Sequence, residues 1–223
     1  MKTTIAILIF TQEASKEATR KTLTPNKNLG LNQYLFSKLN NQIISVAKST
    51  KLPVFRSNDL IESNGLFGKQ LTKAVQKIFE KGFEKVICLG NDCPALSTDK
   101  ILNAATLLEK HNSVIGPDTR GGTYLIGVSK ESFNISVFET LAWESSLMFH
   151  SFTENFDNQS FIIEQLADIH TYNDLKNYTQ FTSFAVYLLQ IIEASLTKTI
   201  VFVKDFFDFL LFNTSILRAP PIS

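Results

Sequence analysis

The chain is poor in several features that define whole classes of protein. Its 223 residues include only two cysteines, Cys88 and Cys93, too few for a disulfide framework or a four-ligand zinc site. Its 22 lysines and arginines are balanced by 21 acidic residues, so no overall field would attract nucleic acid or an anionic membrane. No run of 18 apolar residues occurs, so we predict no ordinary membrane-spanning helix. These absences favour a cytoplasmic protein that does not bind nucleic acid.

Apolar runs of strand length alternate with segments of helical period over most of the chain. Strands are expected at residues 3–10, 52–56, 86–89, 113–116, 123–128 and 166–169. Helices are expected at residues 31–46, 67–78, 97–108 and 137–149, with a polar loop at residues 11–21. A further short helix is expected after Thr171, where Asp174 completes a capping box. Such alternation is typical of an α/β fold with a mostly parallel central sheet and helices on both faces.

The composition changes near residue 180. Residues 185–192 and 200–212 are very apolar and of helical length, but charged residues interrupt the segment that contains them. We therefore predict a main domain at residues 1–180 and a C-terminal helical extension at residues 181–223. Helices that are apolar on most sides are usually buried, so the extension is expected to pack on the domain or to form a homodimer. Attachment to a membrane surface is the alternative.

The loop at residues 90–94 directly follows a strongly apolar expected strand. In open α/β sheets, ligands bind outside the carboxyl ends of the strands, and Asp92 is placed there. Because Mg²⁺ takes one or two protein carboxylates and fills its other positions with water and phosphate oxygens, Asp92 is a candidate metal ligand. The alternative is that Asp92 only orders the turn before Pro94.

Six segments resemble one bacterial family in their order and spacing. The segments are GLFGKQL (65–71), LGNDCPAL (89–96), VIGP (114–117), GGTYLIG (121–127), WESS (143–146) and DIHT with a following DL (168–171 and 174–175). As a set they resemble the radical-SAM/selenodomain-associated transferases, a glycosyltransferase-A-like family. The resemblance implies the GT-A fold of nucleotide-diphospho-sugar transferases, a Rossmann-like sheet that binds a nucleotide and a divalent metal.

The resemblance also implies roles for individual residues. Asp92 matches the metal-binding aspartate and Asp168 matches a carboxylate of the closing motif, so both are candidate ligands for Mg²⁺ or Mn²⁺. Arg120 stands where relatives commonly carry an acidic residue, and either Asp118 compensates from the same loop or Arg120 contacts a phosphate or an acidic acceptor. These three, Asp92, Asp118 and Arg120, are the candidate catalytic residues. His170 stands where the closing motif usually has a second aspartate.

Nucleotide phosphates are expected near the first loop and near the glycines. Lys16, Arg20 and Lys21 retain the positive charge of the family's first loop, although solvated surface charges are the alternative interpretation. The candidate nucleotide- or phosphate-binding residues are Lys16, Arg20, Lys21, Gly68, Asn91, Gly121 and Gly122. The three histidines have no metal-ligand spacing and are not expected to be ligands.

These features predict a metal-dependent glycosyltransferase or nucleotidyltransferase that acts on a nucleoside diphosphate-sugar or a nucleoside triphosphate and an unidentified acceptor. Both reactions need a cation and basic side chains to hold a diphosphate, and the fold serves both. Arg120, His170 and the two glutamates in the first loop motivate an alternative. In that alternative the chain is a catalytically degenerate nucleotide-binding or assembly protein with a docking tail.

Overall fold

The computed structural model of the chain describes residues 4–62, 65–156, 160–178 and 182–197. Two compact units divide the chain, Met1–Thr182 and Ser183–Ser223. Within the second unit, residues 183–197 are helical, and the helix expected at residues 200–212 lies outside the described residues. Among the described helices, none is both long and apolar enough to cross a membrane. Packing of the C-terminal segment on the domain or on a partner stays a prediction.

A six-stranded mixed sheet forms the centre of the first unit. The described strands are β1 (Ile5–Ile9), β2 (Val54–Arg56), β3 (Lys85–Leu89), β4 (Ser113–Pro117), β5 (Thr123–Ser129) and β6 (Ser160–Ile162). Their order is β2-β1-β3-β5-β4-β6. β1 is parallel to β2 and β3, and β4 is parallel to β6, whereas β5 runs antiparallel to both of its neighbours. The prediction of a mostly parallel central sheet is confirmed.

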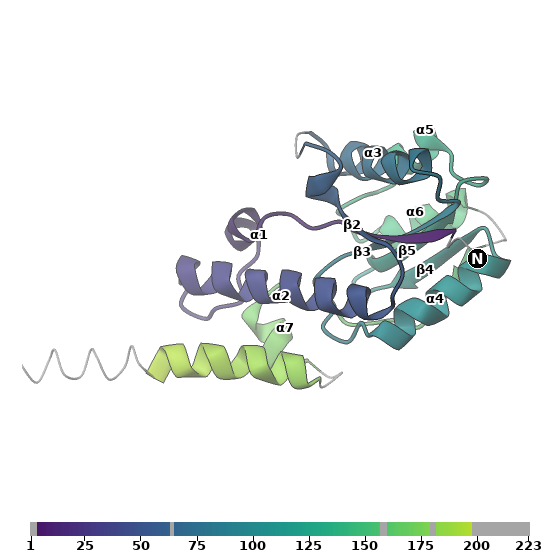
Figure 1. Cartoon of the computed structure of the whole chain (residues 1–223). Coiled ribbons are helices and arrows are strands. Elements are labelled where there is room, and N and C mark those ends of the chain that lie inside the picture. The colour runs from purple at the N-terminus through teal and green to yellow at the C-terminus, as the bar shows by residue number, and fades with distance from the viewer. Residues whose placement is uncertain (1–3, 63–64, 157–159, 179–181, 198–223) are drawn as a thin grey trace, which may run out of the picture. The chain divides into compact units, whose positions relative to one another are not determined.

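Helices cover both faces of this sheet. The described helices of the first unit are α1 (Ala14–Arg20), α2 (Leu29–Ser49), the 3-10 turn η1 (Ser57–Asp59), α3 (Phe67–Glu80), α4 (Thr98–Lys110), α5 (Ile135–Thr140), α6 (Met148–Asn155) and α7 (Tyr172–Lys176). α3, α5 and α6 lie on one side of the sheet, and α2 and α4 lie on the other (Figure 1). The three-layer arrangement predicted from the alternation of elements is confirmed.

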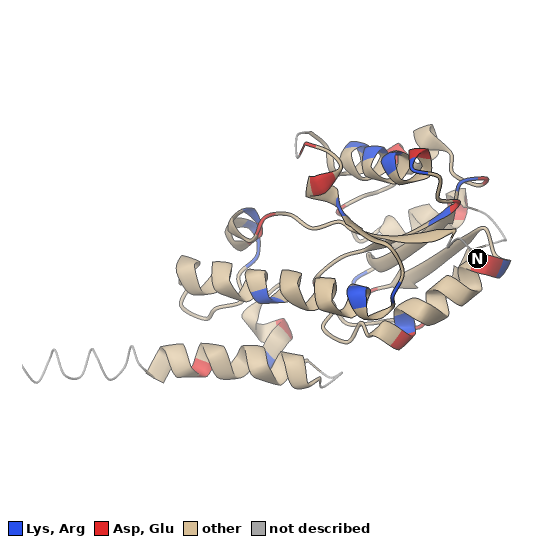
Figure 2. Cartoon of the chain, viewed as in Figure 1, with Lys and Arg blue, Asp and Glu red and all other residues tan. Residues whose placement is uncertain are grey.

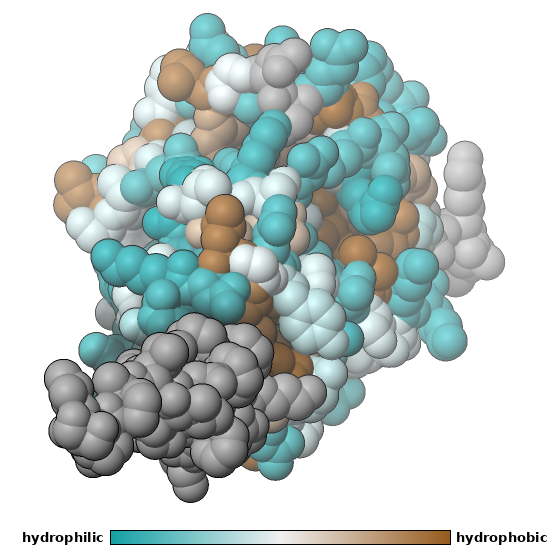
Figure 3. Space-filling view, turned by 90° about the vertical axis from the view of Figure 1, so that its left-hand side faces the viewer, coloured by the Kyte–Doolittle hydropathy of each residue, from teal (hydrophilic) through white to brown (hydrophobic). Residues whose placement is uncertain are grey.

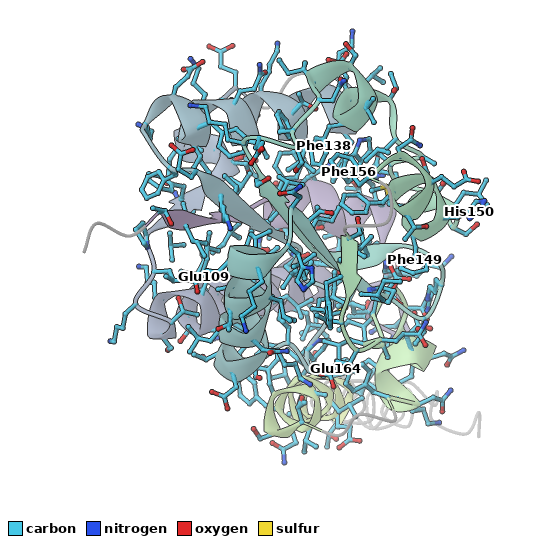
Figure 4. All side chains as sticks on the ribbon, turned by 90° about the vertical axis from the view of Figure 1, so that its right-hand side faces the viewer. Glu109, Phe138, Phe149, His150, Phe156 and Glu164 are labelled. Atoms are coloured by element: carbon cyan, nitrogen blue, oxygen red, sulfur yellow. The ribbon has the colours of Figure 1, made fainter. Side chains whose placement is uncertain are left out.

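The two faces of the sheet bury separate apolar cores. Side chains alternate along a strand, so Ile7 of β1 packs in the core with α2 and α4, and Leu8 packs in the core with α3, α5 and α6. In the latter core, the rings of Phe138 and Phe156 have centroids 6.0 Å apart (Figure 4). Burial on both faces explains why β1 is apolar at every position.

Side-chain caps mark where α4 and α7 begin, and a glycine marks where α3 ends. Ser97 accepts a hydrogen bond from the Lys100 backbone N–H at the start of α4, and caps of this kind contribute about 1 kcal/mol. Both halves of the predicted Thr171–Asp174 capping box are present at α7, so that prediction is confirmed. Gly82 follows α3 with a φ of +91°, as expected for a glycine after a helix end.

Two predicted segments differ in the structure. The polar loop expected at residues 11–21 contains the helix α1, whose Ala18 is buried. Its apolar signal is weak, because a seven-residue helix buries only this one residue. The single helix expected at residues 137–149 is instead two short helices, α5 and α6. The helical conformation is interrupted between them, where Glu144 has a φ of +56°.

The strand expected at residues 166–169 is also wrong. Leu166 forms only an isolated bridge with Asp118, and the sheet is extended by β6 earlier in the chain. The apolar side chains of Leu166 and Ile169 are nevertheless buried. Ile169 donates its backbone N–H to the carbonyl of Asp92, which belongs to a loop rather than to a strand. These buried apolar residues gave residues 166–169 a strand-like sequence pattern, although the segment does not pair as a strand of the sheet.

Candidate functional site

A pocket of about 560 Å³ lies at the edge of the sheet where β1 and β3 end. Its charged lining residues are Glu17, Asp92, Asp118, Glu144 and Asp168, with Arg20, Lys21, Arg120 and His170. This edge faces the viewer in Figure 3, where hydrophilic side chains surround a smaller number of hydrophobic ones. Over the rest of the described chain, acidic and basic residues are spread among each other (Figure 2). The gathering of charge inside one pocket is therefore a local feature.

Three potential metal ligands meet on one wall of this pocket. Asp92, Asp168 and His170 each offer one ligand atom, and these atoms all lie within 4.8 Å of one another. His170 Nε2 is 2.9 Å from Asp168 Oδ2 and 3.3 Å from Asp92 Oδ2. Carboxylate oxygens suit Mg²⁺ and Mn²⁺, and an imidazole nitrogen favours transition metals such as Mn²⁺. The cluster therefore has the chemistry of a divalent-cation site.

One oxygen of this cluster is buried without a hydrogen bond. The Asp168 side chain is only 2% exposed, and its Oδ1 lies 3.1 Å from Arg120 Nε. Its Oδ2 forms an ion pair with His170 Nε2 at 2.9 Å but accepts no hydrogen bond among the described residues. Leaving a buried acceptor unsatisfied costs roughly 1–3 kcal/mol, and more for a charged group. A cation at this oxygen would remove that cost, so the residues fit a metal.

Positive groups balance the carboxylates of the cluster. Lys21 Nζ lies 2.9 Å from Asp92 Oδ2. Burial by itself would raise the pKa of Asp92, but Lys21 and His170 together hold that pKa well below its usual range. Contacts with Asp168 and then Asp92 raise the pKa of His170 to about 9. At neutral pH the metal-free cluster therefore pairs two carboxylates with an ammonium and an imidazolium.

Backbone hydrogen bonds place the closing segment against the loop that carries Asp92. The Ile169 N–H donates to the Asp92 carbonyl at 2.8 Å, and the Tyr172 N–H donates to the Thr22 carbonyl at 3.0 Å. In an extended chain, residues two apart point to the same side, so Asp168 and His170 both face Asp92. Ile169 between them is fully buried. The motif thus supplies two ligand groups to one side and a core residue to the other.

Arg120 connects the glycine-containing loop to the closing segment. In addition to its contact with Asp168, its Nη2 lies 2.5 Å from Asp174 Oδ1. The other oxygen of Asp174 accepts hydrogen bonds from the backbone N–H groups of His170 and Thr171. The guanidinium of Arg120 is therefore held by two carboxylates.

Asp118 orders the loop that it begins. Its Oδ1 accepts backbone hydrogen bonds from Arg120 at 2.7 Å and from Gly122 at 2.8 Å. Burial raises the pKa of Asp118, although these two donors oppose the increase. Gly121 has a φ of +84°, and a Cβ at this residue would lie 2.1 Å from the carbonyl oxygen of Ser146. The loop thus depends on its carboxylate and on glycine.

Comparisons with known proteins agree with this architecture. A crystal structure of a proposed nucleotide-diphospho-sugar transferase from Desulfovibrio desulfuricans G20 has a TM-score of 0.67 and 20% sequence identity, and the match covers 88% of this chain and 98% of that one. The chain has the GT-A fold. Residues 49–145, less than half of the chain, match a sequence family described as an uncharacterized protein conserved in bacteria, DUF2064. No curated protein matches the sequence.

Two other solved structures are similar at lower scores. A glycosyltransferase involved in glycosylation of the major capsid of the virus PBCV-1 has a TM-score of 0.45 and 13% identity, covering 72% of this chain and 81% of that one. A cytidylyltransferase from Leptospira borgpetersenii serovar Hardjo-bovis has a TM-score of 0.38 and 12% identity, covering 87% and 96%.

The remaining candidate phosphate-binding residues are only partly gathered in the GT-A pocket. Arg20 lines the pocket and forms an ion pair with Glu144 at 2.6 Å. Lys16, on the same helix, is exposed and does not line the pocket. Gly68 is buried in α3, and a Cβ there would lie 2.3 Å from the carbonyl oxygen of Glu139. The structure therefore gives Gly68 a packing role between α3 and α5.

Asn91 lines the same pocket and is part of a buried polar network. Its side-chain amide donates to Glu17 Oε2 and to Asn40 Oδ1, both at 2.6 Å. Burial raises the pKa of Glu17, although Asn91 and then Lys21 oppose that increase. This network supports the loop that carries Asp92.

Among the charged or titratable residues that line the pocket, three were not assigned a role from the sequence. His170 was not expected to be a ligand, although its position two residues after Asp168 in an extended segment was the signal that could have indicated one. Glu17 lies one turn before Lys21 on α1, but the segment was expected to be a loop. Glu144 follows the tryptophan of the WESS segment, and no sequence signal points to its contact with Arg20.

Proposed function

We propose that this chain is a transferase that uses Mg²⁺ or Mn²⁺ to move a glycosyl or nucleotidyl group from a nucleotide-activated donor. The observation that supports the proposal is the meeting of Asp92, Asp168 and His170, with a buried Asp168 Oδ2 that accepts no hydrogen bond among the described residues, in a pocket at the carboxyl edge of a GT-A sheet. The resemblance of the six sequence segments to the radical-SAM/selenodomain-associated transferases supports the same function. Membership of that family is part of the proposal.

Asp92, Asp168 and His170 would hold the cation, whose charge would stabilise the diphosphate that forms or leaves during transfer. Lys21 and Arg20, which line the same pocket, would bind the donor's phosphates. Gly122 would let the loop backbone approach the donor closely, and Asp118 keeps that loop in shape. Arg120 holds Asp168 rather than a phosphate in this arrangement.

A smaller pocket of about 230 Å³ adjoins the first one and is a suitable place for the nucleoside base. Phe10 and Phe67 line both pockets, and their rings meet edge to face with centroids 4.9 Å apart. Amide side chains line the smaller pocket as well, at Gln12, Asn58 and Gln70. Aromatic faces stack on planar bases and amides pair with their edges, so this lining suits a heterocycle.

The experiment that tests the proposal is a thermal-shift screen of nucleotides and nucleotide-sugars, with and without Mn²⁺, on wild type and Asp92→Asn. A ligand at a hundred times its dissociation constant stabilises the native state by about 2.7 kcal/mol, enough to measure. We expect a Mn²⁺-dependent shift that Asp92→Asn loses. A folded wild type that shifts with none of these ligands would contradict the proposal and favour the catalytically degenerate assembly protein.

A further inference from the structure

We propose that the Lys21 ammonium and the divalent cation compete for Asp92. In the absence of the cation the ammonium pairs with Asp92, and once the cation binds the ammonium moves to the donor's diphosphate. The inference rests on the proposed function and deepens it. It makes Lys21 a residue with two successive partners, a carboxylate and then a phosphate.

The contact between Lys21 and Asp92 is made on the Asp92 oxygen that also faces the candidate ligand His170. Lys21 Nζ lies 2.9 Å from Asp92 Oδ2, and the same oxygen lies 3.3 Å from His170 Nε2. A cation shared by Asp92, Asp168 and His170 would approach this oxygen from within the cluster, where magnesium sits about 2.1 Å from its ligands. An ammonium and a divalent cation that contact the same oxygen lie close together, and their like charges repel each other. Metal binding should therefore weaken the ion pair with Lys21.

Lys21 can make this movement without a change in the backbone. Its N–H donates to the Glu17 carbonyl at 2.9 Å, and its carbonyl accepts from the side chain of Asn32 at 2.7 Å. These bonds fix its Cα at the end of α1, whereas its side chain lines the pocket and is 24% exposed. A lysine carries its charge on a flexible four-carbon stem, so its ammonium can rotate across the pocket.

The other basic side chains of the pocket are not released in this way. Arg20 is held by Glu144, which is outside the candidate metal cluster. Arg120 contacts Asp168 through Oδ1 and is held also by Asp174, so a cation at Asp168 Oδ2 leaves both contacts in place. Among the described lysines and arginines that line the pocket, Lys21 alone is paired with an oxygen that the cation would take. Metal binding would thus release the Lys21 ammonium in the pocket where a diphosphate would bind.

Two opposite effects follow for a chain without the Lys21 ammonium. In the absence of a diphosphate, the cation should bind this chain more tightly than wild type, because no ammonium competes for Asp92. A diphosphate should bind more weakly to the metal-loaded site, because the freed ammonium is missing. Coupling between two ligands is reciprocal, so removing Lys21 should also reduce the strengthening of Mn²⁺ binding by a diphosphate.

The test measures Mn²⁺ binding to the full-length metal-free chain, from the electron paramagnetic resonance signal of free Mn²⁺, for wild type and Lys21→Met. Methionine keeps an unbranched apolar side chain and removes the charge. We expect Lys21→Met to bind Mn²⁺ about three- to tenfold more tightly, the range expected for an ion pair of intermediate exposure. We expect it to bind inorganic pyrophosphate about tenfold more weakly at saturating Mn²⁺, measured by calorimetry.

Two further variants separate displacement from a general effect of charge. Arg20→Met removes a positive charge from the same pocket without touching Asp92, and Lys21→Arg keeps a positive charge beside Asp92. Arg20→Met should bind Mn²⁺ within about twofold of wild type, because screening weakens charges that are not in contact, and so should Lys21→Arg, because a positive charge still competes for Asp92. Circular dichroism verifies folding, and Lys21→Gln replaces Lys21→Met if the latter does not fold.

The outcomes distinguish this inference from the proposed function. Equal tightening of Mn²⁺ binding in Lys21→Met and Arg20→Met would overturn the inference, because a general field would explain both. If wild type binds Mn²⁺ and Lys21→Met does not bind it more tightly, the inference is overturned too, while the proposed function stands. Absence of Mn²⁺ binding by a folded wild type would overturn the inference and the proposed function together.

Discussion

Arg120 and Asp168 meet so that Arg120 contacts one oxygen of the carboxylate and the other oxygen faces His170 in the candidate metal cluster. Arg120 Nε lies 3.1 Å from Asp168 Oδ1, while Oδ2 is buried beside His170 without a hydrogen bond. A guanidinium on one edge of a carboxylate fixes the direction of the other edge. The presence of Arg120 in this loop is therefore compatible with a metal site, because Arg120 orients one of the candidate ligands.

Replacement of Arg120 by glutamine should destabilise the chain. It leaves Asp168, which is 2% exposed, with His170 but without Arg120 as a charged partner, and we expect a loss of about 1–3 kcal/mol in the free energy of unfolding, allowing for the 42% exposure of Arg120. Urea denaturation measures this loss. The matched control is Arg56→Gln, because Arg56 forms an exposed ion pair with Asp59, worth about 0–1 kcal/mol. Equal losses in both variants would contradict the orienting role of Arg120.

The stability of the metal-free chain should fall at alkaline pH through His170. Its pKa is raised in the folded chain to about 9, above the ordinary value of 6.5. The stabilisation is therefore fully present below pH 6.5 and is lost as the pH rises through about 9. Because the side chain is about a third exposed, we expect an effect on the order of 1 kcal/mol.

Urea denaturation of wild type and His170→Gln in the presence of a chelator, from pH 6 to pH 9.5, measures this linkage. The difference in unfolding free energy between the two chains should shrink across that range, because glutamine carries no titrating charge. A constant difference would show that contacts with Asp168 and Asp92 do not favour the imidazolium.

The fold could be predicted largely from local patterns. β1 is apolar at every position and the apolar residues of α2 recur at helical spacing, so both elements were expected near their observed bounds. The short elements α1 and β6 were missed, because a helix that buries one residue and a three-residue edge strand have almost no periodicity. Tertiary contacts decide such elements, and a single sequence contains no direct sign of them.

The candidate site could be predicted at Asp92 but not as a whole. Asp92 lies in the loop after β3, so the position of ligands in α/β sheets made it a candidate, and the family resemblance favoured a ligand over a residue that only orders the turn. Asp168 came from the family resemblance, and His170 was set aside because the histidines have no regular spacing. The Ile169–Asp92 backbone bond brings these residues together, although many residues separate them in the chain. Contacts of this kind depend on the completed fold.

Substitution of Gly121 by alanine should disrupt the loop beside the cluster. Gly121 has a φ of +84°, and the new Cβ would lie 2.1 Å from the backbone oxygen of Ser146, which cannot rotate away. Gly82 is the matched control, since its φ is +91° but nothing lies within 4 Å of its Cβ position. We expect Gly82→Ala to cost about 1 kcal/mol from backbone strain alone, and Gly121→Ala to cost at least about 2 kcal/mol more.

Thermal denaturation of the two glycine variants provides the measurement, together with Mn²⁺ binding. Gly121→Ala should also weaken Mn²⁺ binding, because Arg120 and Asp118 belong to the same loop and Arg120 contacts Asp168. Similar melting temperatures for the two variants would show that the loop relaxes around the added methyl group.

Replacement of Phe67 by leucine should separate base binding from phosphate binding. Phe67 lines both pockets, and its ring lies 4.9 Å from that of Phe10 between centroids. Leucine keeps most of the apolar contact but has no ring face for a base. Base–aromatic stacking contributes about 1–3 kcal/mol, so we expect binding of uridine or adenosine diphosphate to weaken about tenfold.

Calorimetry at saturating Mn²⁺ tests this prediction with inorganic pyrophosphate as the second probe. Pyrophosphate has no base, so its affinity for Phe67→Leu should match that for wild type if the cation and Lys21 hold the phosphates. Leu66→Ala is the matched control, because Leu66 lines the smaller pocket but is 71% exposed and has no ring. Equal weakening of pyrophosphate and the nucleoside diphosphates in Phe67→Leu would place the defect in the shared phosphate site. The smaller pocket would then lose its assignment to the base.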